Sequence, residues 1–431
     1  MAISPLPSPG AVSSERAPEN LALYESRTTC RICGSPELQP ILSLGNMPLT
    51  AAFLRKEDLS QPEPMFPLTL VFCPECSLTQ LRETVPPEML FRRNYPYYSS
   101  FLPALVQHSK ATASELIASR RLNKSSLVVE LASNDGYLLQ HFVERGVPIL
   151  GIDPAEGQAA AAEKAGVPTL CEFFGAHVAE TLVQSGRSAD VIIANNVLAH
   201  VADLHDFVHG IQILLKDRGV AVLEMPYVRD LVDRCEFDTI YHEHFCYYSL
   251  TALDRLFREH SLFINHVQPI AIHGGSLRIY VEKREFLYAS VQDMLYIEGV
   301  DRVTQIDYYS DFARRVDGIR TKLRDLLTNL DRHGARIAAY GAAAKGVVLL
   351  NYTGIGSDLI DFVVDRNTHK QGLYMPGKHI EILAPDALLT RMSDYVLLLT
   401  WNFADEILEQ QREYRMRGGQ FIIPVPRPRV V

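Results

Sequence analysis

Between Ser126 and about Lys283, short apolar stretches of the chain alternate with stretches of helical character. The apolar stretches are LVVELAS, PILGIDP, DVIIANN and GVAVLEMP, and helices are expected from Tyr137 and from Gly157. This alternation predicts a parallel sheet with helices on both faces, which is an α/β, Rossmann-like arrangement.

The same alternation returns near the C-terminus. Residues 292–333 read as long helices, and RIAAYGAAAKG, IDFVVD and YVLLLTWN then repeat the order of strand and helix. A chain of 431 residues is too long for one ordinary core and suggests about two to four domains. We therefore expect a central Rossmann-like domain over residues 89–285, with a helix from Ala104 to Arg121, and a C-terminal Rossmann-like domain over residues 286–431.

The composition is that of a globular protein, with 47% hydrophobic and 22% charged residues. No run reaches the roughly 18 to 20 apolar residues that a membrane span requires. The net charge of -9, without a long cluster of lysine and arginine, argues against a broad nucleic-acid footprint. We expect neither a membrane nor a nucleic-acid partner, and a monomer or a small homo-oligomer.

Residues 1–24 are rich in Ser, Pro, Ala and Glu and lack both an apolar core and a basic leader. They resemble neither a secretory signal nor a transit peptide, so we expect a disordered tail and a cytoplasmic protein. In that reducing compartment, paired cysteines favour metal ligation over disulfide bonds.

Two C-x-x-C pairs, Cys30 with Cys33 and Cys73 with Cys76, lie about forty residues apart in CRIC and FCPEC. Two residues between paired cysteines let both thiolates reach one ion, and four cysteines complete a tetrahedral zinc site with no open position for water. We predict a structural zinc site in a domain over residues 25–88, whose loss destabilises that domain and leaves the chemical step unchanged. The alternative is a set of buried thiols or a redox pair.

The segment VVELASNDGYLL predicts a cofactor turn. An acidic residue ends its strand, and a degenerate E-x-G-x-G-x-G pattern follows in which only the last glycine remains. The expected cofactor residues are Glu130, Ala132, Ser133, Asn134, Gly136, Asp153 and Asn195. A dinucleotide needs the missing glycines for close approach of its pyrophosphate, whereas S-adenosylmethionine has no phosphate and tolerates bulkier residues. Asp153 closes the second strand, where it can bind ribose hydroxyls, although an aspartate there is also a common turn former.

The densest polar cluster is Tyr241-His242-Glu243-His244. Its histidines are two positions apart, so it is not an H-E-x-x-H zinc protease motif. In an extended segment, His242 and His244 would share a face; in a turn, all four side chains can approach one pocket. The cluster is a candidate catalytic site, with an exposed polar turn as the alternative. His200, just past a strand end, is a second candidate, or a helix cap.

Two further motifs are candidates for substrate binding. HGGSLR supplies His273, Gly275, Ser276 and Arg278 before a strand, and YGAAAKG supplies Tyr340 and Lys345 at the start of a helix. A glycine pair permits close approach of a ligand, and helix N-terminal amides with a lysine suit an anionic group. A plain tight turn and a Rossmann turn that serves only packing are the respective alternatives.

Taken in order, these motifs resemble a known family. CRICG with FCPEC, NYPYYSS, VVELASNDGYLL, NNVLAHV, YHEHF, HGGSLR, YGAAAKG and DRNTHKQGLYMPG are similar to those of the three-domain, zinc-containing sugar C-methyltransferases, which methylate a carbon of nucleotide-linked deoxy ketosugars. The resemblance runs from about Cys30 to Trp401. Ala132 departs from it, because the family usually has glycine there.

The resemblance implies an N-terminal zinc domain, a central S-adenosylmethionine domain and a C-terminal domain that helps to hold a nucleotide sugar, such as a dTDP-sugar, in deoxysugar or antibiotic biosynthesis. Its active-site residues correspond to Tyr95, His200, Tyr241, Glu243 and His244, with His244 as the general base. A neutral imidazole can remove a proton beside a 4-keto group if nearby donors stabilise the enolate, whose carbon, C-3 in this family, then takes the methyl group. The alternatives are an O- or N-methyltransferase of a secondary metabolite and a cofactor-binding protein without turnover.

Overall fold

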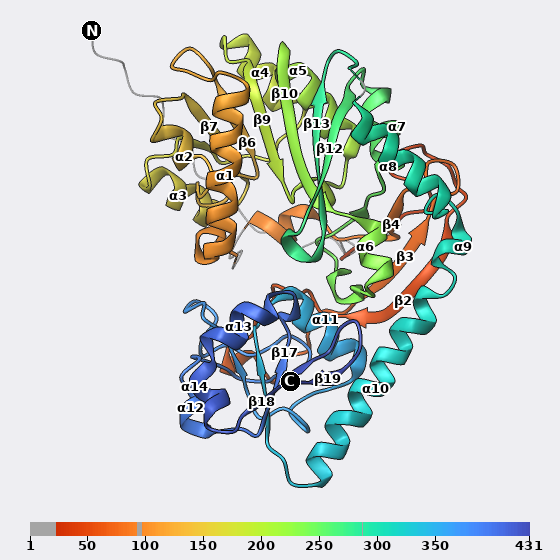
Figure 1. Ribbon diagram of the computed structural model, residues 1–431, viewed down its shortest axis with the longest axis vertical. Helices are drawn as coiled ribbons and strands as arrows, with labels where there is room; N and C mark the ends of the chain where they lie inside the picture. The colour runs from red at the N-terminus through yellow and green to blue at the C-terminus, as the bar shows by residue number, and fades with distance from the viewer. Residues whose placement is uncertain (1–22, 93–96, 287) are drawn as a thin grey trace, which may run out of the picture.

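A computed structural model describes residues 23–92, 97–286 and 288–431. Among these residues the long strands form three sheets, and β1 (Glu25–Ser26) pairs separately with β5 (Glu83–Thr84). In Figure 1 the central sheet and the C-terminal sheet occupy two lobes, and the N-terminal sheet lies beside both. None of the helices described is both long enough and apolar enough to cross a lipid bilayer.

The central sheet has seven strands within the described part of the chain. Their order is β12 (Phe263–Ile270), β13 (Ser276–Glu282), β10 (Leu215–Pro226), β9 (Ala189–Asn195), β6 (Val128–Leu131), β7 (Ile149–Ile152) and β8 (Thr169–Leu170). The predicted parallel sheet is confirmed from β8 to β10, but β13 runs antiparallel to both of its neighbours. The short connection between β12 and β13 explains this, because a parallel neighbour needs a crossover of a dozen or more residues.

Helices cover both faces of the central sheet, because its strands present apolar side chains on both faces. Val128 packs on one face and Val129 on the other, with the same alternation in β9 and β10. One face carries α1 (Pro103–Ser119), α2 (Gln140–Val143) and α3 (Glu156–Lys164), and the other α4 (Ala176–Gln184), α5 (Leu204–Leu214) and α7 (Leu250–Glu259). The helix predicted from Tyr137 begins instead at Gln140, after a turn in which Leu138 and Leu139 are buried.

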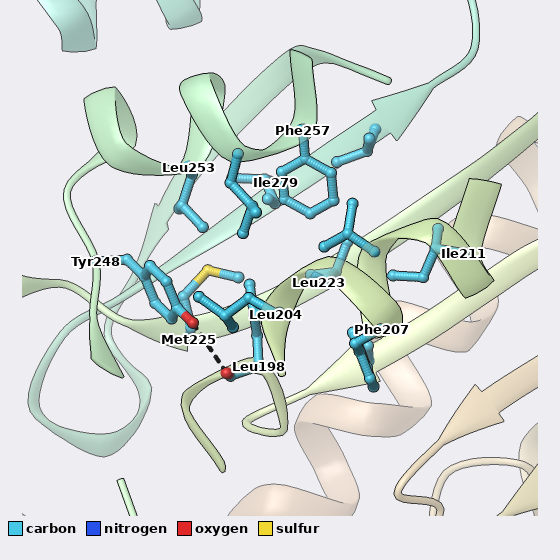
Figure 2. Close-up of a cluster of buried hydrophobic side chains, with 14 of the residues drawn as sticks. Leu198, Leu204, Phe207, Ile211, Leu223, Met225, Tyr248, Leu253, Phe257 and Ile279 are labelled. Carbon is cyan, nitrogen blue, oxygen red and sulfur yellow. Dashed lines mark hydrogen bonds between the residues drawn. The ribbon is translucent and has the colours of Figure 1, made fainter. Parts of the chain in front are cut away.

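The core beneath α5 and α7 also fixes a functional segment. Figure 2 shows Leu204, Phe207 and Ile211 with Leu253 and Phe257, packed around Leu223, Met225 and Ile279. At the edge of this cluster the hydroxyl of Tyr248 donates a hydrogen bond to the carbonyl oxygen of Leu198, at 2.9 Å. That bond holds the 3-10 turn η4 (Leu198–His200), which places His200 beyond the end of β9.

The C-terminal sheet confirms the second Rossmann-like prediction. In the described residues its order is β16 (Ile382–Leu383), β15 (Val363–Val364), β14 (Ile337–Tyr340), β17 (Tyr395–Leu398), β18 (Gln420–Ile423) and β19 (Arg429–Val430), with only β19 antiparallel. The helices after the central sheet are α8 (Ala289–Val300), α9 (Ile306–Tyr309), α10 (Phe312–Arg332), α11 (Ala344–Thr353), α12 (Ala387–Arg391), α13 (Ala404–Gln410) and α14 (Arg412–Met416). The helix α6 (Val228–Asp233) precedes the polar segment around His244.

The N-terminal sheet joins the two lobes. It is antiparallel, in the order β11 (Cys246–Tyr247), β4 (Thr79–Leu81), β3 (Phe66–Phe72) and β2 (Gln39–Met47). Its edge strand β11 comes from the central part of the chain, directly after YHEHF. The long helix α10 runs alongside β2 (Figure 1) and packs Val316, Ile319 and Leu323 into the same apolar cluster as Leu42 and Leu44. All three parts of the chain therefore meet around one region.

Candidate active site

A cavity of about 710 Å³ lies where the three parts of the chain meet. The central part contributes the ends of β7 and β9 and the YHEH segment, and the C-terminal part contributes the turn after β14. The N-terminal part contributes Thr50, Ala51 and Phe53. Ligands of open α/β sheets bind outside the carboxyl ends of the strands, and this cavity lies at the carboxyl ends in both sheets.

The turn after β6 is shaped by backbone geometry. Ala132, Asn134 and Gly136 all have positive φ angles, of 56°, 50° and 78°. Asp153 stabilises the turn, because its carboxylate accepts hydrogen bonds from the backbone N–H groups of Asn134 at 2.8 Å and Ala155 at 2.9 Å. Burial nevertheless raises the pKa of Asp153 to about 6. A buried carboxylate in a cavity wall is suited to a ligand that donates hydrogen bonds, because such bonds stabilise its charged form.

The YHEH segment forms a turn, closed by a hydrogen bond from the N–H of His244 to the carbonyl of Tyr241 at 2.9 Å. Of the two conformations that the sequence leaves open, the structure thus has the turn. Tyr241, Glu243 and His244 line the cavity. His242 instead points to the N-terminal sheet, where its Nε2 donates to the carbonyl oxygen of Pro67 at 2.9 Å.

The two cavity histidines lie close together. The ring centroids of His200 and His244 are 4.7 Å apart, and those of Tyr241 and His244 are 4.0 Å apart. The Nδ1 atom of His244 lies 2.9 Å from the carbonyl oxygen of Thr239, which can only accept, so Nδ1 carries hydrogen and Nε2 the lone pair of the neutral ring. Burial lowers the pKa of His200 to about 4, so that ring stays neutral at physiological pH. Tyr95 lies outside the described residues.

On the C-terminal side, the turn after β14 is held by the same kind of hydrogen bond as the turn after β6. The carboxylate of Asp365, after β15, accepts a hydrogen bond from the N–H of Ala342 at 2.7 Å, as Asp153 does from Asn134. Gly341 has a φ of 96°, and a Cβ atom there would lie 2.5 Å from the Oγ1 of Thr400. Asp365 and Gly341 both line the cavity.

The predicted residues Tyr340 and Lys345 are in the cavity wall, and the Oη of Tyr340 is buried without a hydrogen-bond partner. The Nζ of Lys345 donates to the side chain of Asn402 at 2.9 Å and lies over the ring of Trp401. Burial lowers the pKa of Lys345. Lys370 and Arg366 add two further basic side chains to the wall, and burial lowers the pKa of Lys370 as well. This side of the cavity is suited to an anionic ligand.

The four cysteines of the two C-x-x-C pairs come together. The sulfur atoms of Cys30, Cys33, Cys73 and Cys76 all lie within 4.8 Å of one another. The Sγ distances are 3.4 Å between Cys30 and Cys76 and 3.5 Å between Cys33 and Cys73. A regular tetrahedron with Zn–S bonds of about 2.3 Å has S–S edges of about 3.8 Å, so the cluster fits one zinc ion.

Comparisons with known proteins now decide the family. Family models match residues 30–91 as a zinc binding domain, residues 99–265 as a methyltransferase domain and residues 271–426 as the C-methyltransferase C-terminal domain. C-methyltransferase NovU of Streptomyces niveus is 35% identical over 405 residues, which are 93% of this chain and 96% of NovU. The chain belongs to this C-methyltransferase family. The family membership predicted from the motifs is confirmed, and it favours methyl transfer to carbon over the alternatives considered above.

Solved structures of other methyltransferases align with less than half of this C-methyltransferase. Magnesium protoporphyrin IX methyltransferase of Synechocystis PCC 6803, with bound SAH, is 13% identical, covers 42% of this chain and 83% of its own, and has a TM-score of 0.33. The glycopeptide N-methyltransferase MtfA, complexed with S-adenosylmethionine, is 12% identical, covers 41% and 94%, and has a TM-score of 0.32.

The C-methyltransferase uses S-adenosylmethionine and binds zinc in its N-terminal domain. The residues present fit the methyl donor. Asp153 offers a carboxylate in the cavity wall, and the Oδ1 of Asn195 is buried there without a hydrogen-bond partner. Ala132 and Asn134 also line the cavity, whereas Glu130, Ser133 and Gly136 lie behind the wall. Burial raises the pKa of Glu130, and its Oε2 has no hydrogen-bond partner in the structure.

The HGGSLR motif does not reach the cavity in the way the sequence suggests. A Cβ atom at Gly275 would lie too close to the carboxylate of Asp230, which gives the glycine a packing role. The hydroxyl of Ser276 donates to the carbonyl oxygen of Ile272 at 3.1 Å. Arg278 is buried in an ion pair with Glu224, at 2.7 Å. The structure gives no description of the side chain of His273.

Several cavity residues could not be predicted from the motifs. Pro154, Ala155, Phe173, Phe174 and Val197 form an apolar wall beside Asp153 and Asn195, and Glu236 faces the cavity between Lys345 and the YHEH segment. Burial raises the pKa of Glu236 to about 8, and its Oε1 has no hydrogen-bond partner in the structure. The sequence carries one signal for this residue, the pair of acids in EFDTIYHEH just before the YHEH segment.

Replacing Ala132 with glycine tests the strain in the cofactor turn. A Cβ atom at a φ of 56° costs about 1 to 2 kcal/mol, and glycine gains about 0.5 to 1 kcal/mol of unfolded-state entropy. We expect the free energy of unfolding in urea to rise by about 0.5 to 1 kcal/mol, and calorimetry to show tighter binding of S-adenosylmethionine. Gly136→Ala is the matched control with the opposite sign, because its Cβ would lie 2.9 Å from Val167. A less stable A132G would contradict this account of the turn.

Proposed function

We propose that this C-methyltransferase acts on a nucleotide-linked 4-keto-deoxysugar, in deoxysugar or natural-product biosynthesis. One observation carries the proposal: a single cavity joins the methyl-donor turn, the YHEH segment and a second Rossmann-like turn lined by cations. A nucleotide sugar matches this order, because its diphosphate suits the cationic end and its neutral ketosugar suits the histidines. The methyl donor then occupies the opposite wall.

We assign the nucleotide to the C-terminal wall. The N-terminus of α11 with Lys345 suits the diphosphate, and Lys370 and Arg366 add positive charge nearby. The carboxylate of Asp365 resembles Asp153 in position and suits ribose hydroxyl groups. Tyr340 offers a hydroxyl group. For HGGSLR, the assignment of His273, Gly275, Ser276 and Arg278 to the sugar stays a prediction from the sequence.

We assign the methyl donor to the turn after β6. Asp153 would hold the ribose, and Ala132 and Asn134 would hold the methionine end. Asn195, at the end of β9, would accept a hydrogen bond from a donor group of the cofactor. Behind them, Glu130, Ser133 and Gly136 would support the turn. S-adenosylmethionine supplies an electrophilic methyl group, whose transfer leaves a neutral thioether.

In the proposed mechanism His244 is the general base. With hydrogen on Nδ1, its Nε2 takes the proton from the carbon beside the ketone, and the C–H electron pair passes into an enolate. The hydrogen bond to Thr239 then stabilises the imidazolium that forms. The enolate carbon would form the new C–C bond with the methyl group as the bond between sulfur and that methyl group breaks. The positive charge lost from the sulfonium is then matched by the positive charge gained on protonated His244.

Neutral donors would stabilise the enolate oxygen. Burial raises the pKa of Tyr241 well above its usual value, so its hydroxyl keeps its proton. The neutral ring of His200 donates from one nitrogen only, and the ring also lies within hydrogen-bonding reach of the backbone of Glu243, so donation to the enolate would exchange this contact for the substrate. Tyr95 is assigned the same role from the sequence. Glu243 would orient the sugar through a hydroxyl group.

The position of proton exchange tests the proposal. A 4-ketone acidifies the protons at both C-3 and C-5, and the family resemblance implies C-3. Purified enzyme is screened in D₂O against 4-keto nucleotide sugars, with S-adenosylhomocysteine in place of the methyl donor, and exchange is followed by NMR. We expect exchange at C-3 and, with labelled donor, a C-3 methyl product. Exchange at C-5 alone would move the reaction to the other carbon, and exchange at neither would contradict the enolate mechanism.

We also propose the domain limits 25–88, 89–285 and 286–431 that the sequence suggests. The break near residue 285 falls between the central sheet, which ends with β13, and α8. Limited proteolysis is expected to cut first near these limits.

A further inference from the structure

The N-terminal zinc domain reaches directly into the active site through Thr50. This threonine follows β2 by three residues and is buried. Its Oγ1 donates a hydrogen bond to the Oε1 of Glu243, at 2.9 Å, across 193 positions of sequence. Both residues line the cavity. The contact therefore joins the zinc domain to one of the residues to which we assign a role in the reaction.

Other contacts hold the rest of the YHEHF segment to the same domain. His242 donates to the carbonyl oxygen of Pro67, and the N–H of Leu81 donates to the carbonyl oxygen of Phe245 at 2.8 Å. The strand β11 then pairs with β4. The zinc domain thus holds the side chain of His242 before Glu243 and the backbone of Phe245 after it, and Thr50 contacts the carboxylate of Glu243 itself.

Thr50 itself is held at both ends of its segment. On one side β2 runs into the N-terminal sheet, and on the other Leu54 exchanges two backbone hydrogen bonds with Tyr374, at 3.1 and 2.9 Å. Between them the ring of Phe53 lies 5.1 Å from the Nζ of Lys370. The segment therefore connects the zinc domain to the C-terminal domain. Because both of its ends are held, the hydroxyl of Thr50 has a fixed position beside Glu243.

We propose that Thr50 is a positioning residue for methyl transfer, which acts by fixing the carboxylate of Glu243 in the cavity. The proposal rests on the role that we assign to Glu243 in the proposed function. A hydrogen bond to a charged group is stronger than a neutral one, and a misplacement of about 1 Å at a reacting site can reduce the rate about 100-fold. The zinc domain then contributes to the chemical step as well as to stability.

Three variants of the zinc-loaded enzyme test this inference. Thr50→Val keeps the shape and removes the hydroxyl, Thr50→Ser restores the hydroxyl, and Thr84→Val removes a different hydrogen bond of the zinc domain, which Arg31 donates at 2.7 Å. With a 4-keto nucleotide sugar that the wild type accepts, we expect T50V to lower kcat about 10- to 100-fold with little change in the KM for S-adenosylmethionine. T50S should recover most of the rate, and T84V should resemble the wild type.

A double variant separates positioning from loosening of the domain. If Thr50 acts through Glu243, T50V should lower kcat much less in a Glu243→Gln background than in the wild type. Equal losses in both backgrounds, or a T84V as slow as T50V, would overturn the inference.

A structural comparison keeps the inference testable without a known substrate. Crystal structures of the wild type and T50V, grown under one condition, should show the Glu243 carboxylate displaced in T50V and retained in T50S. An unmoved carboxylate in T50V would overturn the inference even if the panel yields no substrate. Failure of the panel alone would count against the proposed nucleotide sugar and leave the Thr50–Glu243 result to stand by itself.

Discussion

Replacing His244 with alanine is expected to lower methyl transfer and α-proton exchange together, by about 100- to 10,000-fold. The reason is geometric. The hydrogen bond from Nδ1 to the carbonyl oxygen of Thr239 fixes the ring, so that Nε2 carries the lone pair and can take the proton of the substrate. The side chain is not part of the cofactor turn, so calorimetry should show unchanged binding of S-adenosylmethionine.

The neighbouring histidine provides the matched control. His242 lies in the same turn but donates to the carbonyl oxygen of Pro67 and does not line the cavity. His242→Gln should therefore retain turnover within about tenfold of the wild type, with its loss seen in thermal stability instead. Turnover of H244A at the wild-type rate would remove His244 from the role of base, and exchange that survives while methyl transfer is lost would assign it to a later step.

The repeated alternation of strand and helix was sufficient to predict the two α/β sheets, because buried parallel strands leave a strong local pattern. The four-cysteine cluster was also predictable, since the spacing within each C-x-x-C pair brings its two thiols together. The turn after β6 is likewise set by a few neighbouring residues, while its role in cofactor binding stays a prediction. What local pattern does not contain is strand direction. The antiparallel pairing of β13 with β10, for example, joins residues that are 50 to 60 positions apart, from Pro226 with Ser276 to Ala221 with Val281.

Contacts between residues far apart in the sequence also explain why the cavity lining differs from the motifs. In HGGSLR the glycines and Arg278 have the composition of a ligand-binding loop, but Asp230 and Glu224 occupy the space beside them. Conversely, Thr50 carries no motif, and the only signal for Glu236 is the pair of acids before the YHEH segment. They belong to the cavity only because the fold brings the N-terminal and C-terminal parts of the chain against the YHEH segment. Burial then gives the carboxyl of Glu236 a pKa of about 8.

The two turns that line the cavity share one hydrogen-bonding arrangement. In each, an aspartate at the end of the second strand accepts a hydrogen bond from a backbone N–H of the turn after the first strand, Asp153 from Asn134 and Asp365 from Ala342. In each case the second carboxylate oxygen accepts a further backbone N–H, that of Ala155 for Asp153 and that of Asn367 for Asp365. Three basic residues, Lys345, Arg366 and Lys370, line the cavity around the second turn and distinguish it from the first.

Removal of the zinc ion is expected to lower both stability and turnover. In Cys76→Ser one of four ligands is lost, and the free energy of unfolding should fall by at least about 4 kcal/mol, because metal binding and folding of such a domain are coupled. The sequence alone suggests that the chemical step would survive. The structure argues otherwise, since the zinc domain contacts Glu243 through Thr50 and pairs β4 with β11 directly after the YHEHF segment.

Thermal melts, zinc content and labelled methyl transfer, measured on the same preparations, check this prediction. Cys171→Ser is the control, because that exposed thiol lies outside the four-cysteine cluster and its loss should leave zinc content and the melting temperature unchanged. Chelation of the wild type should reproduce the C76S behaviour, and added zinc should reverse it. A metal-free protein that melts at the wild-type temperature would remove the structural role of zinc. A destabilised protein with full turnover at low temperature would show instead that the contacts around Glu243 form without the metal.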